Sequence, residues 1–167
     1  MSRTASNRGV TATDFGRLAE ALASSEQPPR IFHALDELSG ELIGHRLFTI
    51  MRFDPAQSEV ERLYSNMPDV YRVGGRKKKA DTAWANHILH EKRVYRANDA
   101  AGIRAAFDDS TTILGLGLES VLNIPVVFEG RCIGTMNLLH EAGWYQPSDE
   151  QIGVVLGSFL IPVLLSR

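Results

Sequence analysis

The chain has only one cysteine, Cys132, among its 167 residues. A single thiol excludes an internal disulfide framework and a metal site made of cysteines alone, and nothing argues for an oxidising compartment. The formal net charge is −2, so the chain lacks the overall basic field that drives binding to a nucleic acid backbone. We therefore expect a cytoplasmic protein that does not bind nucleic acid.

A stretch long enough to cross a membrane is also missing. Residues 152–165 are apolar but include Ser158 and Pro162, and they fall short of the roughly 20 residues that a transmembrane helix needs. We expect a buried or dimer-forming helix there, which Pro162 would kink or end, and no membrane association. Residues 1–12 lack the apolar segment of a secretory signal, so they predict a flexible tail before a single domain at residues 13–167.

Motifs of several common enzyme classes are absent too. The chain has no Walker-type phosphate loop, no dinucleotide-binding fingerprint and no metalloprotease motif. It shows no evident nucleophile, no paired carboxylates and no third ligand clustered with His87 and His90. We predict a protein that is not an enzyme, with no catalytic residue, no metal and no cofactor.

The first half of the chain combines two helical patterns with a strand pair. Apolar residues at helical spacing predict a helix capped by Thr13 or Asp14 and a second helix over residues 30–43. β-branched and aromatic residues then predict strands over residues 46–54 and 59–66, joined by a turn.

The middle of the chain is less regular. Residues 66–81 are broken by Pro68 and two adjacent glycines, which predicts a loop with at most a short strand or turn. A helix capped by Asp81 or Thr82, a short strand over residues 93–97 and two short helical segments are expected after it.

The last part is a hairpin followed by a helix. Residues 120–128 and 131–139 flank the two-residue turn Glu129–Gly130, and Ser148 or Asp149 caps the final helix after Pro147. The whole order predicts an α+β domain with a central antiparallel sheet. The N- and C-terminal helices cover one face, and an irregular cap of helices and loops covers the other.

Two stretches resemble the GAF domain, the small-ligand sensor module of signalling proteins. "SVLNIPVVFEGRCIGTMNLLHEAGWYQPSDEQI" has the family's apolar-Pro-apolar strand end, its turn, its "IGTxNL" strand and its helix opened by Pro-x-Asp. "DTAWANHILHEKRVYRAND" is similar to the family's cap helix and short central strand, and the resemblance covers residues 14–165. It implies a GAF-like (PAS-like) fold with a pocket between sheet and cap and, on the opposite face, helices that commonly form dimers.

Known GAF ligands include cyclic nucleotides, tetrapyrroles, haem, amino acids and other small metabolites. The chain lacks the Asn-Lys-Phe-Asp-Glu set of the cyclic nucleotide binders, and Cys132 lies in a strand rather than where tetrapyrroles attach. Free methionine-R-sulfoxide reductases need two or more cysteines, because a second thiol resolves the intermediate. The resemblance thus implies a non-enzymatic sensor with an unidentified small-molecule ligand. Two alternatives stay open: a structural dimerisation module with a vestigial pocket, and an enzyme on a small metabolite with His87 as base.

The candidate ligand contacts come from the expected register and from the cap helix. A plain two-residue turn would pair Leu122 with Asn137 and would place Cys132 on the face away from the pocket, whereas a bulge would break this pairing and turn Asn123 inward. Trp84 and His87 are three residues apart on the expected cap helix, so both side chains can point into the same pocket. Trp84 can equally be a core residue, and His87 a surface residue whose hydrogen bonds are already made. The predicted ligand-binding residues are Tyr64, Trp84, His87, Phe107, Ser120, Leu122, Thr135 and Asn137.

Three further expectations concern the surface and the thiol. Cys132 is interpreted as an inert strand residue. The basic run "GRKKK" at residues 75–79 is either a solvated loop or a means to attract an anionic ligand or partner. A homodimer or a separate signalling protein would carry the output, and the predicted dimer face consists of Leu18, Leu22, Val155, Phe159 and Leu160.

Overall fold

A central antiparallel sheet divides the molecule into a helical layer and a cap. The computed structural model describes residues 8–79 and 81–166, and in them the strands follow the order β3-β2-β1-β6-β5-β4. The strands are β1 (Leu47–Asp54), β2 (Glu59–Ser65), β3 (Arg76–Lys78), β4 (Tyr95–Ala97), β5 (Ser120–Phe128) and β6 (Arg131–His140). The predicted α+β class and the antiparallel sheet are confirmed.

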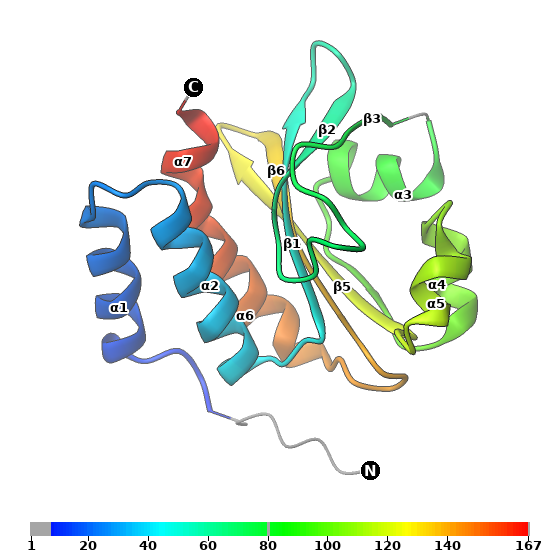
Figure 1. Cartoon of the computed structure of the whole chain (residues 1–167), viewed down its shortest axis with the longest axis horizontal. Helices are drawn as coiled ribbons and strands as arrows, with labels where there is room; N and C mark the ends of the chain where they lie inside the picture. Colours follow the sequence, from blue (N-terminus) through cyan, green and yellow to red (C-terminus); the bar gives the residue numbers. More distant parts are fainter. Residues whose placement is uncertain (1–7, 80, 167) are drawn as a thin grey trace.

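The helical layer consists of α1 (Ala12–Ala23), α2 (Pro29–Leu42) and the C-terminal helices. In Figure 1, α2 and the C-terminal helices lie next to the sheet, and α1 lies on the outer side of α2. Leu35 of α2, Ile50 of β1, Met136 of β6 and Leu156 are fully buried in the cluster that joins this layer to the sheet. The burial of these apolar side chains is the main force that holds the layer on the sheet.

Helix α1 begins earlier than the sequence suggested. Thr11 is the N-cap: its hydroxyl accepts from the Asp14 N–H, while the Asp14 carboxylate accepts from the Thr11 N–H at 2.9 Å. The expected cap at Thr13 or Asp14 is therefore wrong by two or three residues, because Asp14 acts from the third helical position. The flexible tail expected over residues 1–12 overlaps residues 1–7, which lie outside the described residues. Within the described part, Arg8 makes two hydrogen bonds to Asp14.

The C-terminal helix runs in three joined parts, α6 (Pro147–Gly157), the 3-10 turn η2 (Ser158–Leu160) and α7 (Ile161–Leu165). Gln146 is the N-cap rather than Ser148 or Asp149, and the Asp149 carboxylate accepts from the Gln146 N–H at 2.7 Å. Pro162 does not end the helix, because the tighter turn before it places the proline in a first helical turn, where no N–H is needed.

By length and composition alone, Pro147–Leu165 is the one helix among the described residues that could cross a membrane. Core helices can pass the same test, and here Leu156, Leu160 and Leu164 are buried in the cluster against the sheet.

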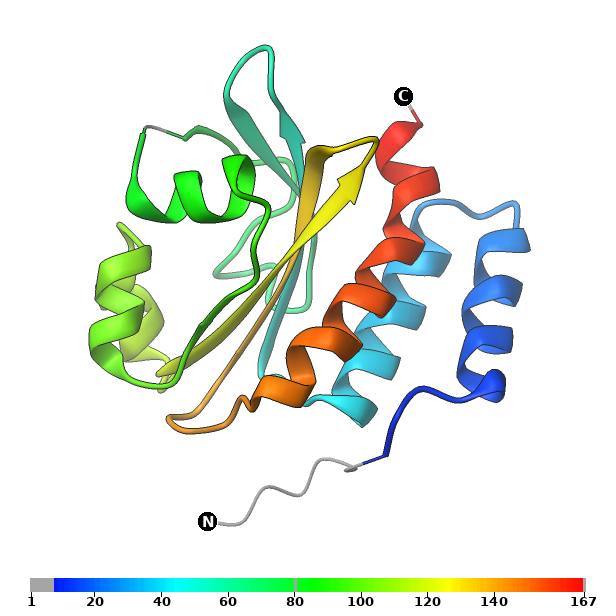
Figure 2. The same ribbon diagram turned by 180° about the vertical axis from the view of Figure 1, so that it is seen from behind.

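The cap lies on the other face of the sheet and is built from α3 (Ala83–Ala85), the π-helical turn η1 (Asn86–His90), α4 (Ala100–Ala106) and α5 (Ser110–Gly115). Figure 2 shows these short elements on the side of the sheet opposite α2 and α6. The Thr82 hydroxyl accepts from the Ala85 N–H at 3.1 Å and starts α3, as one of the two predicted caps. Residues 76–78, expected within a loop, form the short edge strand β3 beside β2.

Two β-bulges decide which side chains face the cap. In β6, Val126 pairs with Gly134 and Val127 with Cys132, so Ile133 is an extra residue. In β2, Ile50 of β1 pairs with Tyr64 and Met51 with Arg62, so Leu63 is an extra residue. Because an extra residue reverses the alternation of a strand, each bulge moves the following side chains to the opposite face.

Candidate functional site

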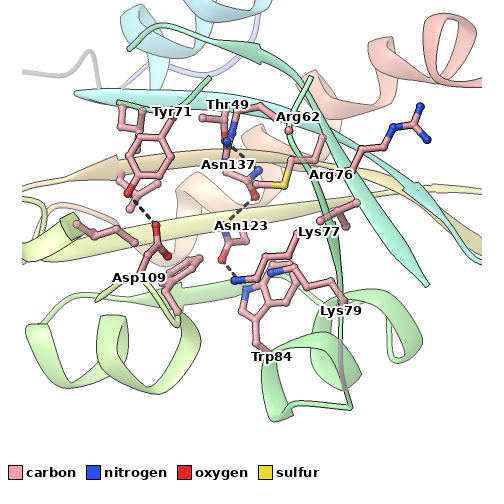
Figure 3. A pocket seen from close by; sticks show the side chains of 17 residues that line it. Thr49, Arg62, Tyr71, Arg76, Lys77, Lys79, Trp84, Asp109, Asn123 and Asn137 are labelled. Atoms are coloured by element: carbon pink, nitrogen blue, oxygen red, sulfur yellow. Dashed lines mark hydrogen bonds between the residues drawn. The ribbon is translucent and has the colours of Figure 1, made fainter. Parts of the chain in front are cut away.

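A cavity of about 320 Å³ lies between the sheet and the cap. Strands β1, β2, β5 and β6 form its floor, and its walls are formed by side chains from residues 71–79, by Trp84, and by α5 with the residues before it (Figure 3). The lining residues are Leu47, Thr49, Met51, Val60, Arg62, Tyr71, Gly75, Arg76, Lys77, Lys79, Trp84, Phe107, Asp109, Ile113, Asn123, Asn137 and Leu139. Binding sites for small molecules commonly have this form, a mostly apolar concavity with a few convergent polar groups.

The floor of the cavity carries a row of polar side chains on three adjacent strands. Asn137 of β6 is paired with Thr49 of β1 on one side and with Asn123 of β5 on the other. Asn123 and Asn137 are only 1% and 3% exposed. Buried amides of this kind are costly unless they are hydrogen-bonded, so their partners determine what the floor can do.

The hydrogen bonds of the floor run in one direction, as Figure 3 shows. The Trp84 indole N–H can only donate, and it donates to Asn123 Oδ1 at 3.0 Å. This orients the Asn123 amide so that its NH₂ donates to Asn137 Oδ1 at 2.8 Å. The Asn137 NH₂ then donates to the hydroxyl oxygens of Thr49 at 3.2 Å and Thr135 at 3.1 Å. Among the described residues, Asn137 thus uses both of its N–H donors, while one N–H of Asn123 makes no hydrogen bond.

Aromatic side chains from the cap close one side of the cavity. Trp84 is 4% exposed, and its ring lies 6.4 Å from that of Phe107 in a tilted arrangement. The Lys79 ammonium lies over the Trp84 ring, 4.5 Å from its centroid. This cation–π contact holds the basic end of residues 75–79 against the cap helix.

Tyr71 and Asp109 join the loop after β2 to the start of α5. The Tyr71 hydroxyl donates to Asp109 Oδ2 at 3.0 Å, and the Arg62 guanidinium lies over the Tyr71 ring at 5.0 Å. Burial, together with the neighbouring Asp109 carboxylate, raises the pKa of Tyr71 above its usual range. Tyr71 therefore stays neutral and acts as a hydrogen-bond donor at physiological pH.

Three of the predicted ligand contacts lie in the cavity wall or floor, namely Trp84, Phe107 and Asn137. Thr135 lies just behind them, where its hydroxyl accepts from Asn137. The first three side chains are therefore placed to contact a ligand. Thr135 is placed to hold Asn137 in position.

The other four predicted contacts are placed elsewhere, and their expected position in the cavity is corrected. Tyr64 follows the Leu63 bulge, so its ring packs against Phe32 of α2 on the helical side of the sheet. Ser120 and Leu122 point to the same side, since Leu122 belongs to the cluster beneath α2 and α6. His87 turns away from the cavity, because its Nε2 hydrogen-bonds the Val94 carbonyl oxygen at 2.8 Å.

The structure adds cavity residues that the sequence did not single out as ligand contacts. Asn123 was expected to point inward only if a bulge interrupted the hairpin, and the bulge at Ile133 is present. Arg62 and Lys79 are far apart in the sequence and meet the same cavity because β2 and the end of β3 run side by side. Tyr71 carried no local signal, since it lies in an irregular segment.

Cys132 lies on the cap side of the sheet, contrary to its expected orientation. It is 3% exposed and belongs to the apolar cluster of Trp84, Ile88 and Leu89. Burial raises the pKa of the thiol, which disfavours the reactive thiolate. Among the described residues, moreover, no three His, Cys, Asp or Glu side chains are grouped closely enough to hold a metal ion.

The predicted dimer face is partly corrected. Leu18 and Leu160 are fully buried in the core of the chain and cannot contribute a surface. Leu22, Val155 and Phe159 are partly exposed. Phe159 stacks on Phe15, whose ring is exposed at the start of α1.

Comparison with known proteins identifies the family. The GAF domain family model matches residues 29–160, which span most of the chain, and the chain belongs to this family. GAF domains are commonly small-molecule-binding sensory domains of signalling proteins. A search of curated proteins finds no match.

Solved structures agree on the fold. The GAF domain of a phosphoenolpyruvate-protein phosphotransferase from Coxiella burnetii superposes with a TM-score of 0.73 at 13% identity, over 90% of this chain and 89% of that chain. The GAF domain of a two-component sensor histidine kinase from Bacillus halodurans has a TM-score of 0.67 at 12% identity, over 84% and 98%. The chromophore-binding domain of a bacteriophytochrome from R. palustris has a TM-score of 0.68 at 10% identity, over 91% and 60%. At these identities the likeness shows the fold alone.

Proposed function

We propose that this protein is a non-enzymatic sensor that binds a small molecule in the cavity between sheet and cap. The observation that carries the proposal is the buried row of Trp84, Asn123, Asn137 and Thr49 at the floor of that cavity. If these positions served only the stability of the core, apolar side chains would serve it at least as well, since buried polar groups contribute little net stability. A fixed amide with one free N–H is instead suited to orient a ligand.

Other features of the site support recognition rather than catalysis. Cys132, the only thiol, is buried and has a raised pKa, and His87 points out of the cavity. The chromophore-binding domain of the R. palustris bacteriophytochrome shares this fold. This fold can therefore carry a bound ligand.

The output of the sensor would pass through a homodimer or through a separate signalling protein. The exposed apolar side chains of the helical layer, Phe15 and Val154, are the surface that supports this part of the proposal. The same surface also suits the second candidate function, a structural dimerisation module whose cavity binds nothing.

Thermal-shift screening of the purified protein against a metabolite library tests the sensor function. A ligand present at 100 times its Kd stabilises the folded state by about 2.7 kcal/mol, which corresponds to a rise in Tm of about 5–10 °C for a domain of this size. We expect Asn123→Ala and Trp84→Ala to abolish the shift. Tyr64→Phe, on the other face of the sheet, should preserve it.

The outcomes separate the two candidate functions. A hit whose shift survives both cavity variants binds elsewhere and contradicts the proposed site. If no compound shifts the Tm and light scattering shows a stable dimer, the dimerisation module is supported instead.

A further inference from the structure

The cavity contains an excess of positive charge. Its lining includes four basic residues, Arg62, Arg76, Lys77 and Lys79, and a single acidic one, Asp109. Two of the basic residues are neutralised nearby, since Lys77 pairs with Asp108 at 2.7 Å and Arg76 with Glu61 at 3.4 Å. Figure 3 also shows the Arg76 guanidinium pointing away from the cavity.

Lys79 is not neutralised in this way. It is half-buried, its ammonium lies over the Trp84 ring, and among the described residues no carboxylate forms an ion pair with it. Burial, and next the charge of Lys77, lower the pKa of Lys79. An ammonium group that has lost water without gaining a carboxylate is a group that an anion would stabilise.

Arg62 is in a similar situation. Within the described part of the chain, its Nε is buried without a hydrogen-bond partner, and its Nη1 donates only to the Arg72 carbonyl oxygen at 3.2 Å. The Asp109 carboxylate favours the charge of Arg62 from a distance, but among the described residues no ion pair links the two, and Asp109 accepts from Tyr71. The planar fork of Arg62 therefore keeps free donors, the geometry that recognises carboxylate and phosphate groups.

The two cations also influence each other across the cavity. Burial and the charge of Lys77 lower the pKa of Lys79 most, the charges of Asp108 and Asp109 oppose this, and the charge of Arg62 adds a smaller lowering. An anion placed between them would turn this repulsion into attraction.

We propose that the cavity binds a small organic anion, whose carboxylate or phosphate group contacts Arg62 and Lys79 and whose apolar body lies against Phe107, Met51 and Val60. The inference rests on the sensor function proposed above and narrows its ligand class. The cavity volume of about 320 Å³ restricts the ligand to a small molecule.

A cationic ligand fits the same cavity poorly. Aromatic rings attract cations through their faces, but Lys79 already occupies a face of Trp84 and Arg62 a face of Tyr71. An added cation would find these faces taken and would meet two charges of its own sign that have no direct ion pair among the described residues.

Lys78 provides the matched control. It lies between two lining residues in the same basic run, but its side chain is exposed and is not part of the cavity lining. Lys78→Gln and Lys79→Gln therefore remove the same charge from neighbouring positions, and only the second removes it from the cavity.

The test uses four probes that share one bicyclic ring: 1-naphthyl phosphate, 1-naphthoate, 1-naphthamide and 1-naphthylmethylammonium. Titration calorimetry on the unmodified protein should show at least one of the two anions binding about tenfold or more tightly than the neutral amide, with the ammonium compound weakest. The comparison of phosphate with carboxylate shows which anionic group the site prefers, and either preference supports the inference.

The variants then assign the effect to the two residues. Arg62→Gln and Lys79→Gln should each weaken the preferred anion by about tenfold and leave the amide unchanged, while Lys78→Gln should stay within about twofold. If Lys78→Gln and Lys79→Gln weaken anion binding equally, the anion is attracted by the overall surface charge rather than by a cavity contact, and the inference is overturned. Because the four probes are first compared on the unmodified protein, the test holds even if one variant fails to fold.

The results also separate this inference from the sensor function. If the amide or the ammonium compound binds as tightly as the anions, the anion inference is wrong. The sensor function survives in that case, provided that Asn123→Ala abolishes the binding. If none of the four probes binds, the anion inference is overturned, and the sensor function falls with it only when the metabolite library also gives no hit.

Discussion

Asn123 and Asn137 lie directly opposite each other on β5 and β6, and the Asn123 amide donates to Asn137 Oδ1 at 2.8 Å. This bond links the cap to the sheet, because Trp84 of the cap helix donates to Asn123 and Asn137 donates onward to Thr49 and Thr135. Loss of either amide should therefore weaken the hydrogen bonding between the cap and the sheet.

Removal of one amide should destabilise the protein by more than the loss of its hydrogen bonds alone, because a buried partner is left unpaired. Asn123→Ala leaves the buried Trp84 N–H unpaired, and Asn137→Ala leaves the Asn123 N–H unpaired, so each should lower the free energy of unfolding by about 1–3 kcal/mol. The double variant should cost less than the sum of the two, since the shared bond is lost only once. Urea unfolding of the four proteins measures this coupling, and strictly additive losses would contradict a connected network.

The fold was largely predictable because its signals are local. Helical spacing of apolar residues, the Glu129–Gly130 turn and the Pro-x-Asp opening of the last helix each act over a few residues. The resulting element order suits few arrangements other than an antiparallel sheet with helices on one face. The errors at the helix starts came from reciprocal caps, in which Asp14 and Asp149 bind back from the third helical position.

The site was less predictable because it depends on two single-residue insertions. Strict alternation places Tyr64 beside Arg62 and turns Cys132 away from Asn137, but the bulges at Leu63 and Ile133 reverse both assignments. Trp84 and Phe107 were found because their positions do not depend on counting through a bulge from the turn, whereas that count paired Asn137 with Leu122 instead of Asn123.

Asp14 should make the stability of the helical layer depend on pH in the acid range. Its carboxylate accepts hydrogen bonds from Arg8 and Thr11, and the Arg8 bond in particular holds the pKa of Asp14 well below its usual range. A carboxyl group whose pKa is lower in the folded chain stabilises the fold above its unfolded pKa of about 3.9, and this contribution is lost as the pH falls below that value.

Chemical denaturation between about pH 6 and pH 3 checks this dependence. The unmodified protein should lose more stability over this range than Asp14→Asn, which has no carboxyl group to protonate. Glu20→Gln, an exposed change on the same helix, should leave the profile unaltered. Equal slopes for Asp14→Asn and the unmodified protein would show that the contact with Arg8 adds nothing to the folded state.

Gly134 and Gly16 should respond to alanine in opposite directions. A Cβ at Gly134 would overlap the carbonyl oxygen of Met51 on the neighbouring strand and would lie 2.8 Å from a methyl group of Leu164. Since the backbone of β1 cannot move aside easily, Gly134→Ala should destabilise the protein by about 1–3 kcal/mol. A Cβ at Gly16, within α1, would meet nothing within 4 Å, so Gly16→Ala should stabilise by about 0.5–1 kcal/mol. Thermal unfolding of both variants gives the two signs, and a stable Gly134→Ala variant would contradict the close packing of β1 on β6.

The helical layer should form the contact surface if the protein signals as a homodimer. Val154 is 46% exposed on α6, and Phe15 is 42% exposed on α1. A buried arginine without a partner is costly at an interface, so Val154→Arg should shift a dimer towards monomer by tenfold or more in Kd, on the order of 2 kcal/mol. Because the side chain points to solvent within one chain, the Tm measured at low protein concentration should change little.

Light scattering over a range of protein concentrations measures this shift. Val127→Arg is the matched control, since Val127 is similarly exposed at 38% but follows Val126, which is buried in the cluster of the helical layer, so the Val127 side chain points to the opposite face of the sheet. The dimer should persist in that variant, because the charge is then remote from α1 and α6. If Val127→Arg dissociates the dimer and Val154→Arg does not, the contact surface lies at the end of the sheet. If the protein stays monomeric at every concentration, the homodimer is excluded, and a separate signalling protein would have to carry the output.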